Sequence, residues 1–571
     1  MRRAARALVI YSAHPGLRPF GAANRRSAWR CRSLPAICSL LALATLCGCS
    51  RSPGGRPPGA PAHGAAILLR GLGAEPDSLD PQKARSDEAQ RVLRDICEGL
   101  TTLDESGRVA PGIAEKWQVS ADGKTYTFSL RHDARWSDGQ PVIAADFVAG
   151  LRRLVDPETA SQYAEVVDVI ANASDIVAGR KHPESLGVSA PDPYTVIVQL
   201  SSPAPYLPAL LSHPSTCPVN PVALVNDRDA YARPGNLPSD AAFTLSQWVH
   251  GSYIYLTRNR YYWNNAATHL DAVKYLITTD EDAELTLYRA DQLEVTDVIP
   301  KSQFDWIRSH LGDQLHIAPA LGVYFYGFDL QRAPFAGDVK VRRALSMVID
   351  RDELARLVLR SGELPAYGWI PSGVADYTPQ SPDYRSLPMA QRIAEARKLY
   401  AQAGYSAARP LRFELRYNTG EVHAEVAIAI ASMWKQALGA KVTLSAEEFR
   451  SLMQDIDRGD VQMFRSSWIG DYNDAYTFAQ YFKSDFGINL THYHNPAYDD
   501  LVDRAAGELD PAKRRAFLEQ AERVMLADQP VIPIYFYVSK HLVKPRVTGW
   551  YSNVMNVTYS KDLGLQGAGA Q

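Results

Sequence analysis

Segments in which apolar and polar residues alternate recur along this chain. Thr125–Arg131 and Leu411–Tyr417 alternate strictly, so that their aromatic and aliphatic side chains fall on one face. A period of two residues is that of a β-strand with one buried face. Val531–Val538 is instead an almost continuous apolar run of β-forming residues. The sequence therefore predicts strands at all three places.

A helical period follows the second of these strands. Apolar residues recur every three or four positions between Val422 and Ala437, Gly439 ends the run, and a further strand, Lys441–Leu444, comes next. A strand, a helix and a strand in this order build a parallel sheet. Caps or helical spacing predict other helices, and short β-rich runs predict other strands. The helices lie at 144–154, 284–290, 339–349, 388–404 and 510–525, and the strands at 67–70, 194–198, 247–262 (a hairpin) and 324–328. The fold class expected is α/β, with mixed sheets in more than one lobe.

The first 48 residues differ from the rest in composition. They hold eight Arg, no Lys and no acidic residue, and the apolar run Ala36–Cys47 leads to Leu46-Cys47-Gly48-Cys49. This order is that of an export signal, and the run is too short to span a bilayer. Leu-x-Gly-Cys resembles the bacterial lipobox, which implies cleavage before Cys49 and lipidation of its thiol; a plain secretory signal is the alternative. Residues 49–65 are rich in Pro and Gly and predict a tether.

Charge and cysteine content narrow the class of protein. Without the eight leader arginines, 53 basic and 63 acidic residues remain, a formal net charge of −10. An acidic chain without a basic run is a poor nucleic-acid binder. Beyond Cys49 only Cys97 and Cys217 remain. Because they lie far apart in sequence, we expect two buried free thiols, no disulfide and no cysteine-based metal site.

One stretch concentrates polar chemistry. Arg465–Asp474 (RSSWIGDYND) places a guanidinium, an indole, two hydroxyls and a carboxylate within seven residues, directly after the apolar run Val461–Phe464. A strand ending in a polar, aromatic-lined loop is expected here. An Arg and an Asp held close together suit a ligand with a cation and an anion of its own, such as a free peptide. An ordinary surface loop with one ion pair is the alternative.

Motifs spread over the chain carry a resemblance to a known family. They are EPDSLDP at 75–81, EGL at 98–100, PGIAEKW at 111–117, WSDG at 136–139, RNRYYW at 258–263 and PF followed by VRRALSMVID at 334–350. In this order they resemble the family-5 solute-binding proteins of peptide and nickel ABC transporters. The match extends over about residues 67–560 and is closest to the oligopeptide-binding members.

The resemblance implies a two-lobed, type II periplasmic-binding-protein-like fold with an extra inserted domain. Domain I comprises residues 66–97, 223–321 and 539–571, domain II is the insertion 98–222, and domain III is 322–538. The ligand lies between lobes that close by hinge bending.

The resemblance also assigns roles to residues. Asp471 is expected to pair with the α-ammonium of a peptide, Arg465 with the carboxylate of a tripeptide, and His423 with that of a longer peptide. Other residues implied to line the site are Tyr163, Trp468, Asn418, Phe449 and Tyr537, with backbone groups from Ser466, Ser467 and the loop Ala84–Asp87, which contains Arg85 and Asp87. Main-chain pairing of this kind gives affinity without sequence preference.

This sequence departs from the family at some cleft positions. Gly322 and Ile469 stand where a disulfide is usual, and Leu359 and Ile456 where a Lys and an Arg are usual. Arg360 is a candidate replacement for the lysine. These departures bear on the length of peptide that the protein prefers. The aspartate that the family uses for the amino end of the peptide is retained as Asp471.

We therefore expect a monomeric lipoprotein of the periplasm, anchored through Cys49, that delivers oligopeptides to the permease of an ABC importer, without cofactor or metal. A murein peptide, a dipeptide, a nickel chelate or haem is the alternative ligand. A peptidase is a distant alternative, because H-E-x-x-H, G-x-S-x-G and P-loop patterns are absent from the sequence.

Overall fold

A computed structural model describes residues 65–226 and 230–567, and these residues belong to one compact unit. The predicted export signal and the lipidation site Cys49 lie outside the described residues, as does nearly all of the tether. Within the described ranges, none of the helices combines the length and the apolar character that crossing a bilayer requires.

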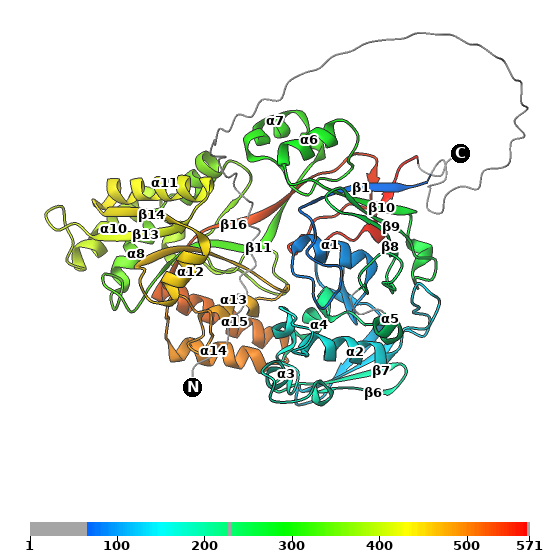
Figure 1. Ribbon diagram of the computed structural model, residues 1–571. Helices are drawn as coiled ribbons and strands as arrows, with labels where there is room; N and C mark the ends of the chain where they lie inside the picture. The colour runs from blue at the N-terminus through cyan, green and yellow to red at the C-terminus, as the bar shows by residue number, and fades with distance from the viewer. Residues whose placement is uncertain (1–64, 227–229, 568–571) are drawn as a thin grey trace, which may run out of the picture. The chain divides into compact units, whose positions relative to one another are not determined.

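Two four-stranded sheets are built mostly from the first half of the chain (Figure 1). The first has the order β1-β10-β9-β8, with β1 parallel to β10 and the other pairs antiparallel. The second, called here the β4–β7 sheet, is antiparallel with the order β4-β5-β7-β6. Their strands are β1 (Ile67–Gly73), β8 (Phe243–Val249), β9 (Tyr253–Arg258), β10 (Ala272–Ile277), β4 (Ala114–Val119), β5 (Thr125–Leu130), β6 (Val188–Asp192) and β7 (Thr195–Gln199). β2 (Thr101–Leu103) and β3 (Val109–Pro111) form a hairpin, and β17 (Val547–Thr548) pairs with β18 (Gly564–Leu565).

The third large sheet has six strands in the order β12-β16-β11-β15-β13-β14. They are β11 (Leu315–Phe328), β12 (Leu364–Pro365), β13 (Arg412–Asn418), β14 (Lys441–Glu447), β15 (Met463–Ile469) and β16 (Val531–Leu542). β13 and β14 are parallel and are joined by α11, which confirms the predicted strand–helix–strand unit. Alternation along β11 sends Val323 and Phe325 to one core and Tyr324 and Tyr326 to another. The sheet is therefore buried on both faces.

Helices cover these sheets, and five of the six predicted helices begin within one residue of the predicted start. Asp338 and Asp510 cap α8 and α15 by accepting hydrogen bonds from the backbone N–H groups of Lys340 and Ala512. The helices are α1 (Asp87–Ile96), α2 (Ala144–Val155), α3 (Ala173–Val177), α4 (Leu207–Leu210), α5 (Pro221–Asn226), α6 (Glu281–Arg289), α7 (Phe304–His310), α8 (Val339–Met347), α9 (Arg351–Leu354), α10 (Met389–Gln402), α11 (Glu421–Leu438), α12 (Phe449–Asp457), α13 (Tyr476–Ala479), α14 (Pro496–Gly507) and α15 (Pro511–Asp528). The α6 helix begins three residues before the predicted start.

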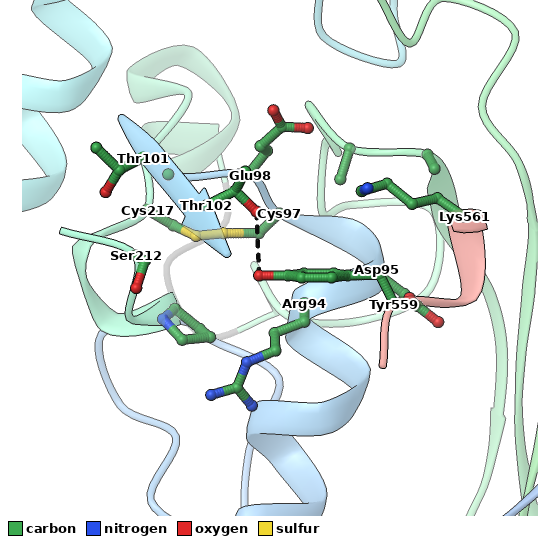
Figure 2. A pocket seen from close by; sticks show the side chains of 14 residues that line it. Arg94, Asp95, Cys97, Glu98, Thr101, Thr102, Ser212, Cys217, Tyr559 and Lys561 are labelled. Atoms are coloured by element: carbon green, nitrogen blue, oxygen red, sulfur yellow. Dashed lines mark hydrogen bonds between the residues drawn. A yellow bond between two sulfur atoms is a disulfide. The ribbon is translucent and has the colours of Figure 1, made fainter. Parts of the chain in front are cut away.

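The prediction of free thiols is wrong. Cys97, which caps the end of α1, and Cys217 form a disulfide with their Cα atoms 6.3 Å apart, although 120 residues separate them in sequence (Figure 2). Sequence separation does not report distance in the fold, and here the end of α1 lies beside the segment after α4. A cavity of only about 10 Å³ adjoins the disulfide, which is room for one water molecule.

Candidate functional site

The stretch singled out in the sequence lies on β15 and the loop after it. β15 extends further than the apolar run suggested and includes Arg465 to Ile469. Along its whole length it pairs with β11, from Met463 opposite Phe328 to Ile469 opposite Gly322. On its other side the ladder with β13 includes only Met463 and Phe464. Beyond Phe464, β15 therefore continues without β13 as its neighbour.

Arg465 is held inside the protein at the start of this segment. Its residue exposure is 2%. One guanidinium nitrogen donates to Oδ1 of Asn418 at 2.9 Å and another to the hydroxyl of Tyr537 at 3.1 Å. The guanidinium carbon lies 4.5 Å from the centre of the Tyr324 ring, a distance that allows a cation–π interaction. The fold thus places a fixed positive charge here, and the three side chains just named that contact it are neutral.

His423 belongs to the same cluster. It lies in the first turn of α11, and its ring centre is 5.6 Å from that of Tyr324. Burial, and to a lesser extent the charge of Arg465, lower the pKa of His423 to about 3. The imidazole is therefore neutral at neutral pH, and it can meet a carboxylate as a hydrogen-bond donor but not as a cation.

Two polar side chains of the loop after β15, those of Asp474 and Asn473, are fixed by hydrogen bonds. Asp474 accepts two hydrogen bonds from Arg514, at 2.6 and 2.9 Å. Asn473 donates to the backbone oxygen of Gly107 at 2.9 Å and accepts from the N–H of Ala375 at 2.9 Å. The carboxylate of Asp471, in contrast, accepts a long hydrogen bond of 3.5 Å from the hydroxyl of Thr477 as its one side-chain partner among the described residues.

Asp471 combines an exposed residue with a partly desolvated carboxyl group. Its residue is exposed, yet the protein around its carboxyl group is dense enough that desolvation raises the pKa to about 6. Among the described residues, no Lys, Arg or His forms an ion pair with it. A carboxylate in this position is accessible and partly desolvated, and it lacks a cation.

Tyr163 brings a distant part of the chain to Asp471. Its hydroxyl donates to the backbone oxygen of Arg85 at 3.3 Å. Burial first, and then the nearby charges of Asp87 and Asp471, raise the pKa of the Tyr163 hydroxyl. Arg85 itself is tied to Asp77 through its side chain and its backbone N–H. The loop before α1 and Tyr163 therefore share one neighbourhood with Asp471.

The predicted site residues thus fall into two groups. Arg465, Asn418, Tyr537 and His423 form one, and Asp471, Tyr163, Arg85 and Asp87 form the other. Ser466 and Ser467 lie between them on β15 and are buried. Trp468 is only 7% exposed and packs on Tyr481 with ring centres 5.2 Å apart. Phe449 is half-buried at the start of α12.

Sequence reasoning missed three supporting residues. Tyr324 lies under Arg465, Thr477 contacts Asp471, and Asp77 fixes Arg85. The predicted strand at 324–328 was a signal for Tyr324, because successive side chains of a strand point to opposite faces, which puts the Tyr324 ring on the face opposite Phe325. Nothing in the local sequence distinguishes Thr477 or Asp77 from other polar loop residues.

The departures from the family also have clear positions. Leu359 and Ile456 are buried in the apolar cores. Ile469 is 48% exposed, and its Cδ1 atom lies 2.5 Å from where a Cβ at Gly322 would stand. Arg360 forms an ion pair with Asp305. In the described ranges, no group of three or more His, Cys, Asp or Glu residues could hold a metal ion.

Comparison with known proteins decides the family. The family model described as "Bacterial extracellular solute-binding proteins, family 5 Middle" matches residues 108–489. This chain belongs to that family. The periplasmic oligopeptide-binding protein OppA of Escherichia coli is 37% identical over 500 residues, which are 87% of this chain and 92% of that protein.

Two further relatives of this family-5 protein bear on its ligand. The probable deoxycholate-binding periplasmic protein YgiS of E. coli is 39% identical over 493 residues, 86% of this chain and 92% of that protein. The structure of the murein tripeptide-binding protein MppA in its unliganded open form matches with a TM-score of 0.82 and 36% identity, over 88% of this chain and 97% of that one. The chain has the mixed α/β fold of these two-lobed solute-binding proteins, and the fold class expected from sequence is confirmed.

Proposed function

We propose that this family-5 protein captures oligopeptides between Asp471 and Arg465 and delivers them to an ABC importer. One observation carries the proposal: an exposed carboxylate without a cation among the described residues lies six positions along the chain from a buried, fixed guanidinium. The two charges are opposite in sign to the two ends of a free peptide. Burying an ammonium group without a carboxylate would leave its desolvation uncompensated.

The spacing suits a short peptide. Six residues of extended chain cover at most about 20 Å. The side chains of Arg465 and Asp471 take up part of this span. The remainder fits an extended peptide of about three or four residues, at roughly 3.4 Å per residue.

The backbone around β15 supports binding of the ligand as an added strand. From Arg465 onward β15 has left its β13 neighbour, and Ser466 lies in this part of the strand. The loop Ala84–Asp87 contributes backbone groups from the other side in our proposal. Such main-chain hydrogen bonds are common to all peptides, and they explain broad acceptance of sequences.

We also propose the three-domain arrangement 66–97 with 223–321 and 539–571, 98–222, and 322–538, closing around the ligand. In support, the two smaller sheets draw their strands from the first two sets of residues. β11 and β16 cross the proposed boundaries, and their register is irregular between Pro319 and Val323. A break in the ladder is a suitable place for bending. The similarity to an unliganded open form agrees with an open starting state.

Location in the cell is part of the same proposal. We propose cleavage before Cys49, lipidation of that thiol and a monomer held at the periplasmic face of a membrane. Metabolic labelling with a radioactive fatty acid should mark the wild type and not Cys49→Ala. Labelling of both proteins would remove Cys49 as the anchor.

The central test compares blocked peptides on the ligand-free wild type by calorimetry. Tri-alanine should bind, N-acetyl-tri-alanine should bind at least about a hundredfold more weakly, and tri-alanine amide should also lose affinity. The acetyl group removes the ammonium, and the amide removes the carboxylate. Equal binding of free and acetylated tri-alanine would overturn the proposal.

The similarity to YgiS gives a second candidate, deoxycholate. This ligand carries a carboxylate and no cation. Arg465 suits such a group, whereas the accessible carboxylate of Asp471 would repel it. Deoxycholate should therefore neither bind tightly nor displace tri-alanine; displacement at micromolar concentration would favour this candidate instead.

A further inference from the structure

A stack of three tyrosines joins distant parts of the chain next to Asp471. Tyr206 directly precedes α4, and its ring centre lies 5.2 Å from that of Tyr472 and 4.9 Å from that of Tyr476. The ring planes differ by only 8° and 16°. At these separations the rings are offset-stacked, an arrangement that stabilises aromatic pairs.

Tyr206 also connects separate apolar cores. It packs against the core of the β4–β7 sheet, which includes Leu207. It packs as well against the core on one face of the six-stranded sheet, which includes Tyr476. A small third cluster joins Tyr472 with Ala209 and Leu210 and is also covered by Tyr206. In Figure 1 the linked helices are α4 and α13.

A second link acts on the neighbouring residue. The amide of Asn473 donates to the backbone oxygen of Gly107, in the β2–β3 hairpin, and the same side chain accepts from Ala375 N–H. Tyr472 and Asn473 are thus both held by segments outside the six-stranded sheet. They directly follow Asp471, whose carboxylate is contacted by one side chain of the described part of the chain, the hydroxyl of Thr477 at 3.5 Å.

We infer that Tyr206 is a positioning residue for Asp471. The two residues do not need to touch: Tyr206 fixes Tyr472, and the backbone of Tyr472 fixes the direction of the preceding carboxylate. This inference rests on the proposed function, because it assigns to Tyr206 the orientation of the group that meets the ligand ammonium. A misdirected carboxylate would lose the ammonium but leave the backbone and carboxylate contacts of the ligand intact.

The experiment measures two affinities for each of four proteins. Tri-alanine and N-acetyl-tri-alanine are titrated into the wild type, Tyr206→Ala, Tyr206→Phe and Tyr194→Ala. We expect Tyr206→Ala to weaken tri-alanine by about tenfold, since two stacked pairs are lost, and to leave the acetylated peptide within about twofold. The preference of the protein for the free amine should therefore shrink by about the same factor.

Two variants serve as matched controls. Tyr206→Phe keeps the ring and should keep the wild-type preference. Tyr194→Ala removes another stacked tyrosine, in the turn between β6 and β7, whose ring lies 3.9 Å from that of His132. It should lower the thermal midpoint without changing the preference. A purely structural role of Tyr206 would instead lower both affinities together.

The outcomes separate this inference from the proposed function. If the wild type does not distinguish the two peptides, the proposed function fails. If the wild type distinguishes them and Tyr206→Ala keeps the same ratio, only the role of Tyr206 is overturned. If Tyr206→Ala folds poorly, Tyr206→Leu replaces it, because leucine retains apolar bulk without stacking. A reduced ratio of tri-alanine affinity to N-acetyl-tri-alanine affinity in Tyr206→Leu supports the role of Tyr206, and an unchanged ratio overturns it.

Discussion

The two ends of the candidate site are built in opposite ways. Arg465 lies within a strand, is almost fully buried, and is fixed by Asn418, Tyr537 and the ring of Tyr324. Asp471 lies in a loop and is exposed, and its contacts with Thr477 are long, 3.4 Å from its backbone N–H and 3.5 Å at its carboxylate. The positive end is therefore part of the framework of the sheet. The carboxylate at the negative end is accessible to a ligand. The loop that carries it is held in place through the residues that follow Asp471.

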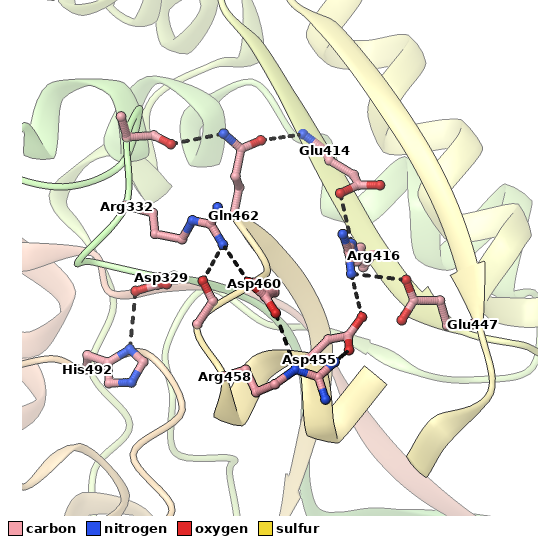
Figure 3. A network of polar contacts seen from close by, with 12 residues as sticks. Asp329, Arg332, Glu414, Arg416, Glu447, Asp455, Arg458, Asp460, Gln462 and His492 are labelled. Carbon is pink, nitrogen blue, oxygen red and sulfur yellow. Dashed lines mark hydrogen bonds and ion pairs between the residues drawn. The ribbon is translucent and has the colours of Figure 1, made fainter. Parts of the chain in front are cut away.

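A third charged region shows what a purely structural arginine looks like in the same sheet. Arg416, on β13, is surrounded by Glu414, Glu447 and Asp455, at 2.8, 3.3 and 2.6 Å (Figure 3). Its acidic neighbours raise the pKa of Arg416, although desolvation opposes them. Arg416 thus has its charge neutralised by acids, whereas the hydrogen bonds described for Arg465 go to neutral groups. The two arginines therefore differ in the partners described for them, and our proposal assigns the ligand carboxylate to Arg465.

The largest effect is expected from Arg465→Met. The substitution leaves the Asn418 oxygen and the Tyr537 hydroxyl without their donor, and we expect the free energy of unfolding to fall by about 3 kcal/mol. Binding of tri-alanine should be lost as well, while tri-alanine amide should lose less. Denaturant unfolding and calorimetry measure the two effects.

Arg416→Met is the control for this substitution. It should also reduce stability, because three carboxylates would face one another, yet leave the affinity for tri-alanine unchanged. Comparable loss of binding in both variants would contradict the distinction between the two arginines.

Asp471→Asn should separate binding from stability. Because the pKa of Asp471 is raised in the folded protein, its ionisation disfavours folding as pH rises from about 4 through about 6. The neutral amide removes that effect, so the thermal midpoint at pH 7 should not fall. Affinity for tri-alanine should drop by about 2 kcal/mol or more.

Asp168→Asn is the matched control for charge. Asp168 is likewise exposed, and burial followed by the charge of Glu165 raises its pKa to about 6. If tri-alanine affinity fell equally in both variants, the general negative field, and not Asp471 itself, would attract the ligand.

How much of this could be predicted from sequence depends on whether the cause is local. Strand β5, the unit from β13 to β14, and the caps of α8 and α15 follow from residue spacing, and the structure confirms them. The position of Asp471 after a strand also followed from local pattern. The Cys97–Cys217 disulfide did not, because the two residues meet only through packing of distant segments. Tyr163 and Arg85 came from family resemblance, since no local signal places them beside Asp471.

The pH dependence of binding sharpens the comparison further. The ammonium of a bound peptide favours the charged carboxylate, so the ligand binds the deprotonated form of Asp471 better. Affinity should approach its full value well above pH 6, where Asp471 is fully ionised, and fall on acidification by at most about tenfold per pH unit. Titrations between pH 5 and 7 keep most of the peptide amine protonated, because its pKa is near 8. Asp471→Asn should show no such slope, and Asp168→Asn should retain it.

The smallest effect is expected at His423, and it tests whether the positive end contains one cation or two. A pKa of about 3 makes the imidazole neutral throughout this pH range. His423→Gln, which keeps a hydrogen-bonding group, should therefore change tri-alanine affinity by less than about threefold and leave its pH dependence the same. If wild-type affinity instead showed a second rise below pH 6 that His423→Gln abolished, the ligand would be drawing a proton onto His423. Arg465 and a protonated His423 would then both bind the ligand carboxylate. The positive end of the site would in that case gain one of its charges only when the ligand binds.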